Sequence, residues 1–317
     1  MIVAACSSGG SGGGSSPDPK TAPLTGADGG SGVDLDRRAL GFKIDNTPPA
    51  IPQSGVESAD LIYEEVVEGG LTRLLVVFQS QNADSVGPIR SVRPVDPKLI
   101  KGLGNAVLIF SGGQPGVLDL VKQSGVTTVS PNSNSGAFKR ESGRSSPHNL
   151  YSSTGDIYGV LSDKNGAPPE LATFGNLPSD MKTAPATKVD VVFERTSPTV
   201  WTYNSDAGKY ERQFNGAPEK VASGATLQID NLVFQQVESI PTSFTDENNQ
   251  PVPNWKVVGQ GKLWVARDGK IVTGTWNRSS ETGVAKLTDE SGNEIPLHTG
   301  NTWWSLVPAA TGSVTAS

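Results

Sequence analysis

Two short segments of this chain carry side chains that suit the binding of an anion. The first, 87–94, reads Gly-Pro-Ile-Arg-Ser-Val-Arg-Pro and places Arg90 and Arg93 between prolines. Proline favours an extended or turned backbone over a helix, so this segment is expected to be a fixed loop. Guanidinium groups donate two parallel hydrogen bonds to a carboxylate or a phosphate, which makes the segment a candidate anion site.

The second segment, 138–151, adds further cations, a histidine and an asparagine. We expect the two segments to converge on one pocket lined by Arg90, Arg93, Arg140, Arg144, His148 and Asn149. The alternative is that the arginines only organise loops by pairing with internal acids such as Asp45, Glu64, Glu65 or Glu141.

His148 is the better candidate of the two histidines for catalysis, because it follows a proline and lies among polar residues. A neutral imidazole can act as a general base near pH 7, and Glu64 or Glu65 could orient it. The two glutamates cannot form a carboxylate pair, since neighbours on a strand point to opposite faces. A histidine that merely bonds to loop backbone is the alternative. Whether the protein is an enzyme stays open.

Composition argues against several other classes of protein. The chain has 317 residues with one cysteine, two histidines and a net charge of -6. Thiolate and multi-histidine metal sites are therefore not expected. A mildly acidic chain is a poor nucleic-acid binder. We expect no cofactor, since the chain has no phosphate-binding or dinucleotide fingerprint.

The start of the chain predicts a lipid anchor. Val3 to Cys6 reads Val-Ala-Ala-Cys, the form of a bacterial lipobox, so Cys6 would carry fatty acyl chains such as palmitate. A leader normally has a cationic region and about 7 to 15 apolar residues, so 1–6 is interpreted as a truncated signal peptide whose true start codon lies upstream. A chance cysteine in a short tail is the alternative. The anchor would place the protein on the outer face of the cytoplasmic membrane.

Residues 7–34 are rich in Gly, Ser, Pro and Asp and predict a flexible tether. Such a coil would hold its load on the order of 30 Å from the membrane. The sequence offers no other run long and apolar enough to span a bilayer.

The remaining chain predicts an α+β protein with an N-terminal mixed α/β domain and a β-rich C-terminal domain. In the first domain, 35–175, strands 60–67 and 72–78 form a hairpin around Glu68-Gly69-Gly70. The other elements expected there are a helix from Asp96 to Gly102 or Gly104, a buried strand at 106–110, a helix at 116–123 and a strand at 126–129.

The second domain, 188–310, shows strand patterns and little helical periodicity. Asp268-Gly269 is the strongest hairpin signal between its strands. The residues between the domains, rich in Pro, Ala and Lys, predict a boundary, and 311–317 predicts a small polar tail. The predicted strands are 189–193, 200–204, 210–214, 227–237, 261–266, 271–276, 285–288 and 302–307.

Five sequence blocks together resemble the YerB-like bacterial lipoproteins, a family defined by a domain of unknown function. The most specific blocks are Gly-Pro-Ile-Arg-Ser-Val-Arg at 87–93 and Pro-His-Asn-Leu-Tyr at 147–151. The others are at 41–46, 59–65 and 274–276. The resemblance covers nearly all of 34–308 and implies a lipid-anchored envelope protein with two domains. It implies no activity.

Two functions remain. The first is a lipid-anchored envelope protein that binds an anionic cell-wall polymer or a partner's acidic loop through the Arg/His site. A tether suits this role because it confines the search for targets near the membrane. The second is an envelope hydrolase or transferase that uses His148 as general base, with Glu65 as the candidate orienting group.

Overall fold

The computed structural model describes residues 21–28, 34–194, 198–214 and 216–317. Three α-helices occur among these residues: α1 (Asp96–Gly102), α2 (Pro115–Ser124) and α3 (Thr154–Val160). The 3-10 turns are η1 (Pro48–Ala50), η2 (Val56–Ser58), η3 (Glu68–Gly70) and η4 (Ser135–Ala137). The strands are β1 (Leu40–Asp45), β2 (Leu61–Val66), β3 (Thr72–Phe78), β4 (Val107–Ile109), β5 (Thr127–Val129), β6 (Lys139–Arg140), β7 (Leu150–Tyr151), β8 (Ala184–Pro185), β9 (Lys188–Val192), β10 (Pro198–Asn204), β11 (Lys209–Phe214), β12 (Ala217–Pro218), β13 (Gln228–Ile229), β14 (Asn231–Val237), β15 (Gly259–Arg267), β16 (Lys270–Arg278), β17 (Lys286–Asp289), β18 (Thr302–Pro308) and β19 (Ser313–Ala316).

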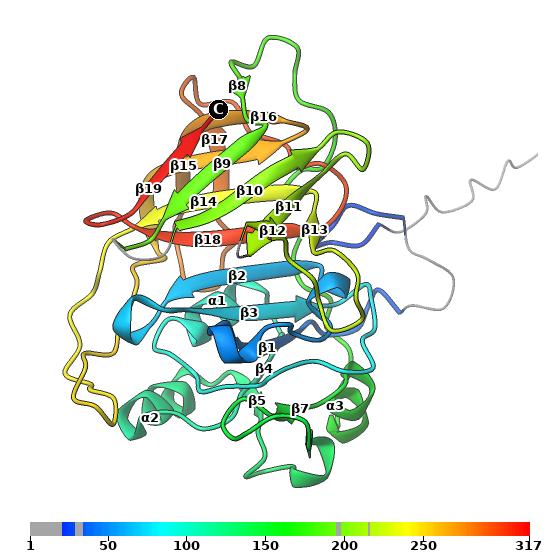
Figure 1. Cartoon of the computed structure of the whole chain (residues 1–317), viewed down its shortest axis with the longest axis vertical. Coiled ribbons are helices and arrows are strands. Elements are labelled where there is room, and N and C mark those ends of the chain that lie inside the picture. Colours follow the sequence, from blue (N-terminus) through cyan, green and yellow to red (C-terminus); the bar gives the residue numbers. More distant parts are fainter. Residues whose placement is uncertain (1–20, 29–33, 195–197, 215) are drawn as a thin grey trace, which may run out of the picture.

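One mixed sheet runs through both halves of the protein. Its strand order is β17-β16-β15-β14-β18-β2-β3-β1-β4-β5, and β8 pairs with β16. β18 lies between β14 of the C-terminal half and β2 of the N-terminal half and is parallel to both. The helices α1, α2 and α3 all lie in the half that holds β1 to β5 (Figure 1). The predicted division into two parts is present, but the parts share a sheet.

The two strongest hairpin signals are confirmed. β2 and β3 pair antiparallel as far as Val66 and Thr72, and Gly69 in the turn has a φ of 70°. β15 and β16 pair as far as Arg267 and Lys270, and Asp268 and Gly269 have φ values of 52° and 69°. Two successive positive φ values match the twist of the flanking strands, which is why Asp-Gly suits this position.

β1 was not predicted as a strand, yet it is central. It pairs antiparallel with β3 and parallel with β4. All six of its residues are buried, including the charged Lys43 and Asp45. A strand covered on both faces shows no alternation of polar and apolar residues and is normally recognised as a continuous apolar run. In β1 that run is interrupted by the charged residues Lys43 and Asp45.

A smaller sheet packs against the C-terminal part of the large one. Its strand order is β12-β11-β10-β9-β19, and β13 pairs with β11. The rings of Trp201 on β10 and Trp303 on β18 meet at 5.1 Å between centroids. The predicted polar tail at 311–317 is therefore wrong, since β19 completes the edge of this sheet by pairing with β9.

Part of the predicted tether is ordered. Ala22 and Leu24 are buried, and the carbonyl oxygens of Pro23 and Thr25 accept hydrogen bonds from Leu171 N and Gly300 N at 2.9 Å. One leucine and one alanine supply enough apolar contact to hold 21–28 against the body. Cys6 and the rest of the tether lie outside the described residues. In the described part of the chain, no helix has the length and hydropathy needed to cross a bilayer.

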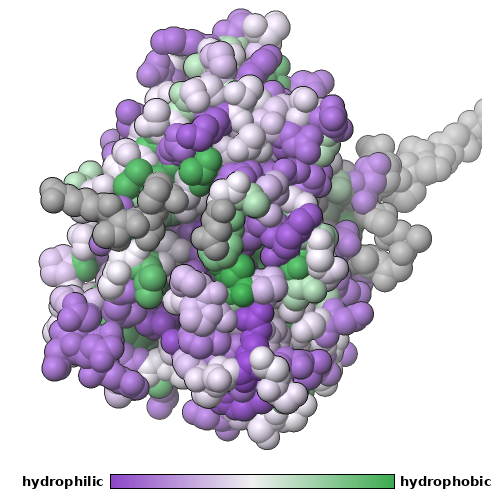
Figure 2. Space-filling model, in the orientation of Figure 1, coloured by the Kyte–Doolittle hydropathy of each residue, from purple (hydrophilic) through white to green (hydrophobic). Residues whose placement is uncertain are grey.

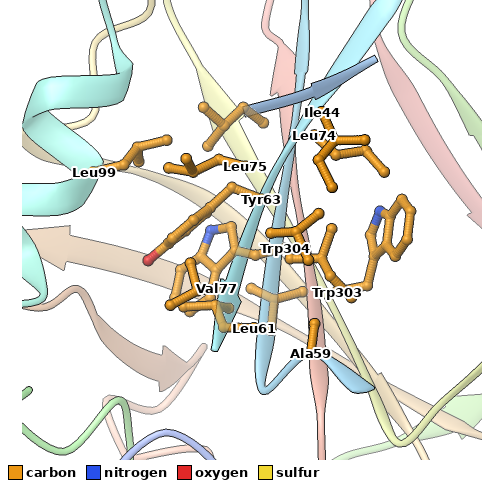
Figure 3. Close-up of a cluster of buried hydrophobic side chains, with 14 of the residues drawn as sticks. Ile44, Ala59, Leu61, Tyr63, Leu74, Leu75, Val77, Leu99, Trp303 and Trp304 are labelled. Carbon is orange, nitrogen blue, oxygen red and sulfur yellow. The ribbon is translucent and has the colours of Figure 1, made fainter. Parts of the chain in front are cut away.

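The centre of the large sheet has apolar cores on both faces. Trp303 and Trp304 are neighbours on β18, so they point to opposite sides. Figure 3 shows Trp303 near Leu74 on one side and Trp304 near Tyr63 on the other. The centroids of the Tyr63 and Trp304 rings lie 5.9 Å apart. These tryptophans are core residues and do not form an exposed stacking platform for sugars.

Candidate functional site

Asp45, at the end of β1, joins the two cationic segments. Its buried Oδ2 lies 3.0 Å from Arg90 Nε and 2.7 Å from His148 Nδ1. Its backbone N–H donates to the carbonyl oxygen of Pro88 at 2.9 Å. Segments 87–94 and 138–151 therefore meet, and the group on which they meet is a carboxylate.

A pocket of about 660 Å³ opens beside Arg90. Its walls come from the β2–β3 turn, β3, segment 90–93, Pro147, the residues before α2, and the loop at 238–258 between β14 and β15. The side chains that can carry charge on these walls are Glu68, Arg73, Arg90, Arg93, Asp246 and Glu247. The site is therefore built by both halves of the protein.

Arg73 is a pocket cation that was not predicted from the sequence. It lies on β3, opposite Asp45 on β1 and Glu65 on β2. Its Nη1 donates to the carbonyl oxygen of Ser91 at 3.2 Å, whereas its buried Nε has no hydrogen-bond partner among the described residues. Burial, with the repulsion of Arg93 and Arg90, lowers the pKa of Arg73 to about 10. The sequence signal for Arg73 as a site residue was its position as a cation on the inward face of an otherwise apolar strand.

Arg93 also lines the pocket, but its hydrogen-bonding capacity is largely used. Its Nη2 and Nε lie 2.5 Å and 3.1 Å from Oε2 of Glu68. Its Nη1 donates to the carbonyl oxygens of Ser91 and Val92. For Arg93, therefore, the alternative of internal pairing with an acid describes the structure, although the acid is Glu68.

Arg140 and Arg144 lie elsewhere. Arg144 donates to the carbonyl oxygens of Pro49 and Pro52 at 3.0 Å and 2.6 Å. Arg140 donates to Oδ1 of Asn149 at 2.6 Å, and these residues do not line the pocket. Segment 138–151 folds onto itself through β6 and β7, which turns both guanidinium groups away. The expected six-residue site is thus wrong in Arg140, Arg144 and Asn149, and also in His148, since only Arg90 and Arg93 of the six line the pocket.

His148 is held by Asp45 through Nδ1, and its side chain is 22% exposed. The fixed Nδ1 leaves Nε2 facing away from the carboxylate, as a general base requires. His148 is, however, not among the residues that line the pocket.

Glu65 does not orient His148, which corrects that part of the sequence analysis. It is buried with Lys43, whose Nζ hydrogen-bonds to Glu65 Oε1 and also lies 2.9 Å from Asp96 Oδ1. Glu64 points to the opposite face, as expected for strand neighbours, and accepts from Trp303 Nε1 at 2.9 Å. The carboxylate that holds the His148 ring is that of Asp45, and not that of a glutamate.

Burial raises the pKa of Glu65 from 4.5 to about 7, against the attraction of Lys43. The folded protein therefore holds this proton more tightly than the unfolded chain. The free energy of unfolding should fall as the pH rises between these two values. In Glu65→Gln this fall should be reduced, measured as urea unfolding at about pH 5 and about pH 7.5. Glu141→Gln, at a half-buried surface position, is the control. An unchanged pH slope in Glu65→Gln would contradict the assignment.

Metal chemistry has no obvious place in the described residues. In 21–28, 34–194, 198–214 and 216–317, histidine, aspartate and glutamate form no cluster of three or more that could hold an ion.

The chain matches the models of two domains of one protein family, described as a protein of unknown function (DUF3048). The N-terminal domain matches residues 24–167 and the C-terminal domain matches residues 189–304. The chain belongs to the DUF3048 family. The match begins within the ordered segment 21–28, in agreement with the packing of Leu24.

Two comparisons with known proteins reach nearly the whole chain. "Putative lipoprotein YerB" of Bacillus subtilis (strain 168) is 26% identical over 295 residues, which cover 90% of this chain and 86% of the relative. The crystal structure of YerB protein from Bacillus subtilis superposes with a TM-score of 0.78 at 23% identity, over 93% of this chain and 99% of that one. The resemblance stated from the sequence is confirmed, and the structural match supports the fold.

Proposed function

We propose that this protein is a lipid-anchored cell-envelope lipoprotein on the outer face of the cytoplasmic membrane. The support is the lipobox-like run that ends at Cys6 and the similarity to "Putative lipoprotein YerB" of Bacillus subtilis. Acyl chains on Cys6 would anchor the protein, since two or more chains hold a protein stably on a bilayer.

The pocket beside Arg90 binds an anionic group in this proposal. The observation that carries it is that Arg73 and Arg90 both face one pocket and both keep free donors. Arg90 lies near Asp45 only through Nε, and within the described residues its Nη atoms donate no hydrogen bond. Arg73 has a single side-chain bond, from Nη1, in the same part of the chain. A carboxylate or phosphate would satisfy both guanidinium groups.

The volume of the pocket and the dipole of α2 also support the binding of an anion. A pocket of about 660 Å³ falls within the range of roughly 300 to 1,000 Å³ that small-ligand sites occupy. Residues 112–115 lead into α2 and line the pocket, so the positive end of a ten-residue helix faces it. An anionic cell-wall polymer carries suitable groups close to the membrane.

The test compares the binding of glycerol-phosphate teichoic acid at low salt by the unchanged protein and by the Arg90→Gln variant. We expect the substitution to weaken binding by about tenfold, about 1.4 kcal/mol, because one charged donor pair is lost. Arg140→Gln, exposed and outside the pocket, should bind like the unchanged protein. The thermal midpoint of each variant is measured alongside. Unchanged affinity with a large loss of stability in Arg90→Gln would support the alternative, in which the arginines only organise loops.

The second candidate function is an envelope hydrolase or transferase with His148 as base. The bond from His148 Nδ1 to Asp45 favours it, because it fixes the imidazole as a base requires. One observation weakens it: His148 does not line the pocket. Anion binding therefore has the stronger support.

A further inference from the structure

The pocket has two sides of opposite charge. Arg73 and Arg90 stand on the side formed by β3 and segment 90–93. Asp246 and Glu247 stand on the loop at 238–258, and Glu68 lies on the β2–β3 turn. Glu68 is paired with Arg93, but a site for a simple anion gains nothing from Asp246 and Glu247 along its walls, since like charges repel. The acidic side therefore requires its own explanation.

The acidic loop is held in place and is not a loose surface segment. Figure 1 shows it running from the end of β14 down to α2. Its Phe244 packs on α2, where a Cβ added to Gly116 would lie 2.4 Å from Phe244 Cε1. Trp255 Nε1 donates to the carbonyl oxygen of Val66 on β2 at 3.0 Å. These contacts fix the acidic residues opposite the arginines.

The tip of the loop is also fixed by its own hydrogen bonds. Asp246 Oδ1 accepts from the backbone N–H groups of Asn248 and Gln250, both at 2.8 Å. Glu247 is exposed, and its carboxylate has no partner among the described residues. On the face shown in Figure 2, the surface is mainly hydrophilic and apolar residues form only small, separate patches. Through Glu247, the loop at 238–258 presents a free carboxylate at the pocket.

Besides Arg90 Nε, which lies beside Asp45, two buried polar atoms on the pocket walls have no hydrogen-bond partner within the described chain. Arg73 Nε is a donor, in a residue that is 7% exposed. Glu68 Oε1 is an acceptor, in a side chain that is 9% exposed. An unpaired buried polar atom costs free energy, so each is expected to be satisfied by something that enters the pocket. One needs an acceptor and the other needs a donor.

We propose that the ligand of this pocket is a compact zwitterion, with a carboxylate or phosphate and a primary ammonium on the same molecule or chain end. The anionic group binds at Arg73 and Arg90, and the ammonium binds at Glu68 and Glu247. This inference rests on the proposed anion binding and specifies its ligand class. An ammonium supplies three donors, which suits several carboxylates that converge from separate elements.

The experiment compares two matched pairs of probes by ligand-observed NMR. The zwitterions are phosphoethanolamine and β-alanine, and their counterparts without the ammonium are ethyl phosphate and propionate. Within one pair at least, the zwitterion should bind about five- to tenfold more tightly, as one or two partly solvated ion pairs allow. The pair that binds tells whether the anionic group is a phosphate or a carboxylate.

Two variants test whether the acidic loop causes the preference for a zwitterion over its counterpart without the ammonium. Glu247→Gln should reduce the preference for the zwitterion, because the ammonium loses one of its two carboxylates and the counterpart loses a repelling charge. Glu290→Gln, an exposed glutamate outside this pocket, should keep the full preference. Equal affinities within both pairs, or a preference that Glu247→Gln leaves unchanged, would overturn the zwitterion and leave anion binding intact. No binding of any probe in millimolar titrations would overturn both proposals.

Discussion

Lys43→Met should lower the free energy of unfolding by about 3–5 kcal/mol, the usual cost of removing one partner from a buried ionic cluster. Lys43 is fully buried on β1 between the carboxylates of Glu65 and Asp96. Methionine fills nearly the same volume, so the change removes the charge and leaves two carboxylates together without a cation. The cost should shrink at about pH 5, where the raised pKa of Glu65 allows it to take up a proton.

Urea unfolding followed by circular dichroism measures this loss. Lys270→Met on β16 is the matched control, because Lys270 is exposed and should change stability by less than about 0.5 kcal/mol. Equal unfolding midpoints for the two variants would show that the buried cluster is not ionic in the folded protein.

Glu64→Ala should cost about 3 kcal/mol, because its carboxylate links three separate parts of the chain. Oε2 accepts from Trp303 Nε1 at 2.9 Å, and Oε1 accepts from Thr72 at 2.9 Å. The guanidinium group of Arg212, on the smaller sheet, lies 3.4 Å from Oε1. Removal of the carboxylate leaves a buried indole N–H unpaired and takes one of the two acids away from Arg212.

Glu64→Gln should lose less than Glu64→Ala, since an amide oxygen still accepts from Trp303. Glu238→Ala is the control, a surface glutamate paired only with Lys256. Thermal unfolding by calorimetry should also show one transition for the unchanged protein, because Glu64 connects the N-terminal half to both sheets. Two resolved transitions, with Glu64→Ala affecting neither, would contradict this role.

Much of the fold could be predicted from sequence, because local signals decide hairpins and strands. Asp268-Gly269 specifies a turn with two positive φ values, and the run at 72–78 matches β3 residue for residue. The failures have a common cause in tertiary context. β1 was missed because its buried charges, Lys43 and Asp45, find partners only on other strands and loops. The β19 edge strand was missed because it pairs with β9, far away in sequence.

The candidate site was predicted only in part. The meeting of segments 87–94 and 138–151 follows from their composition, but Asp45 decides which side chains point inward. Arg140 and Arg144 have the same residue type as Arg90 and were indistinguishable from it in sequence. Arg73, on β3, and the acidic loop at 238–258 lie far apart from each other in the sequence. Only the register of the sheet brings Arg73 beside the loop.

The position of β18 has a consequence for how this protein is made. Its residues are synthesised after those of β2 and β14, yet both of these strands need β18 to complete their hydrogen bonding. Until it arrives, each presents an open strand edge that another chain can pair with. A fragment limited to the first family domain would keep that edge permanently, so aggregation of such fragments is the expected hazard when the domains are expressed apart.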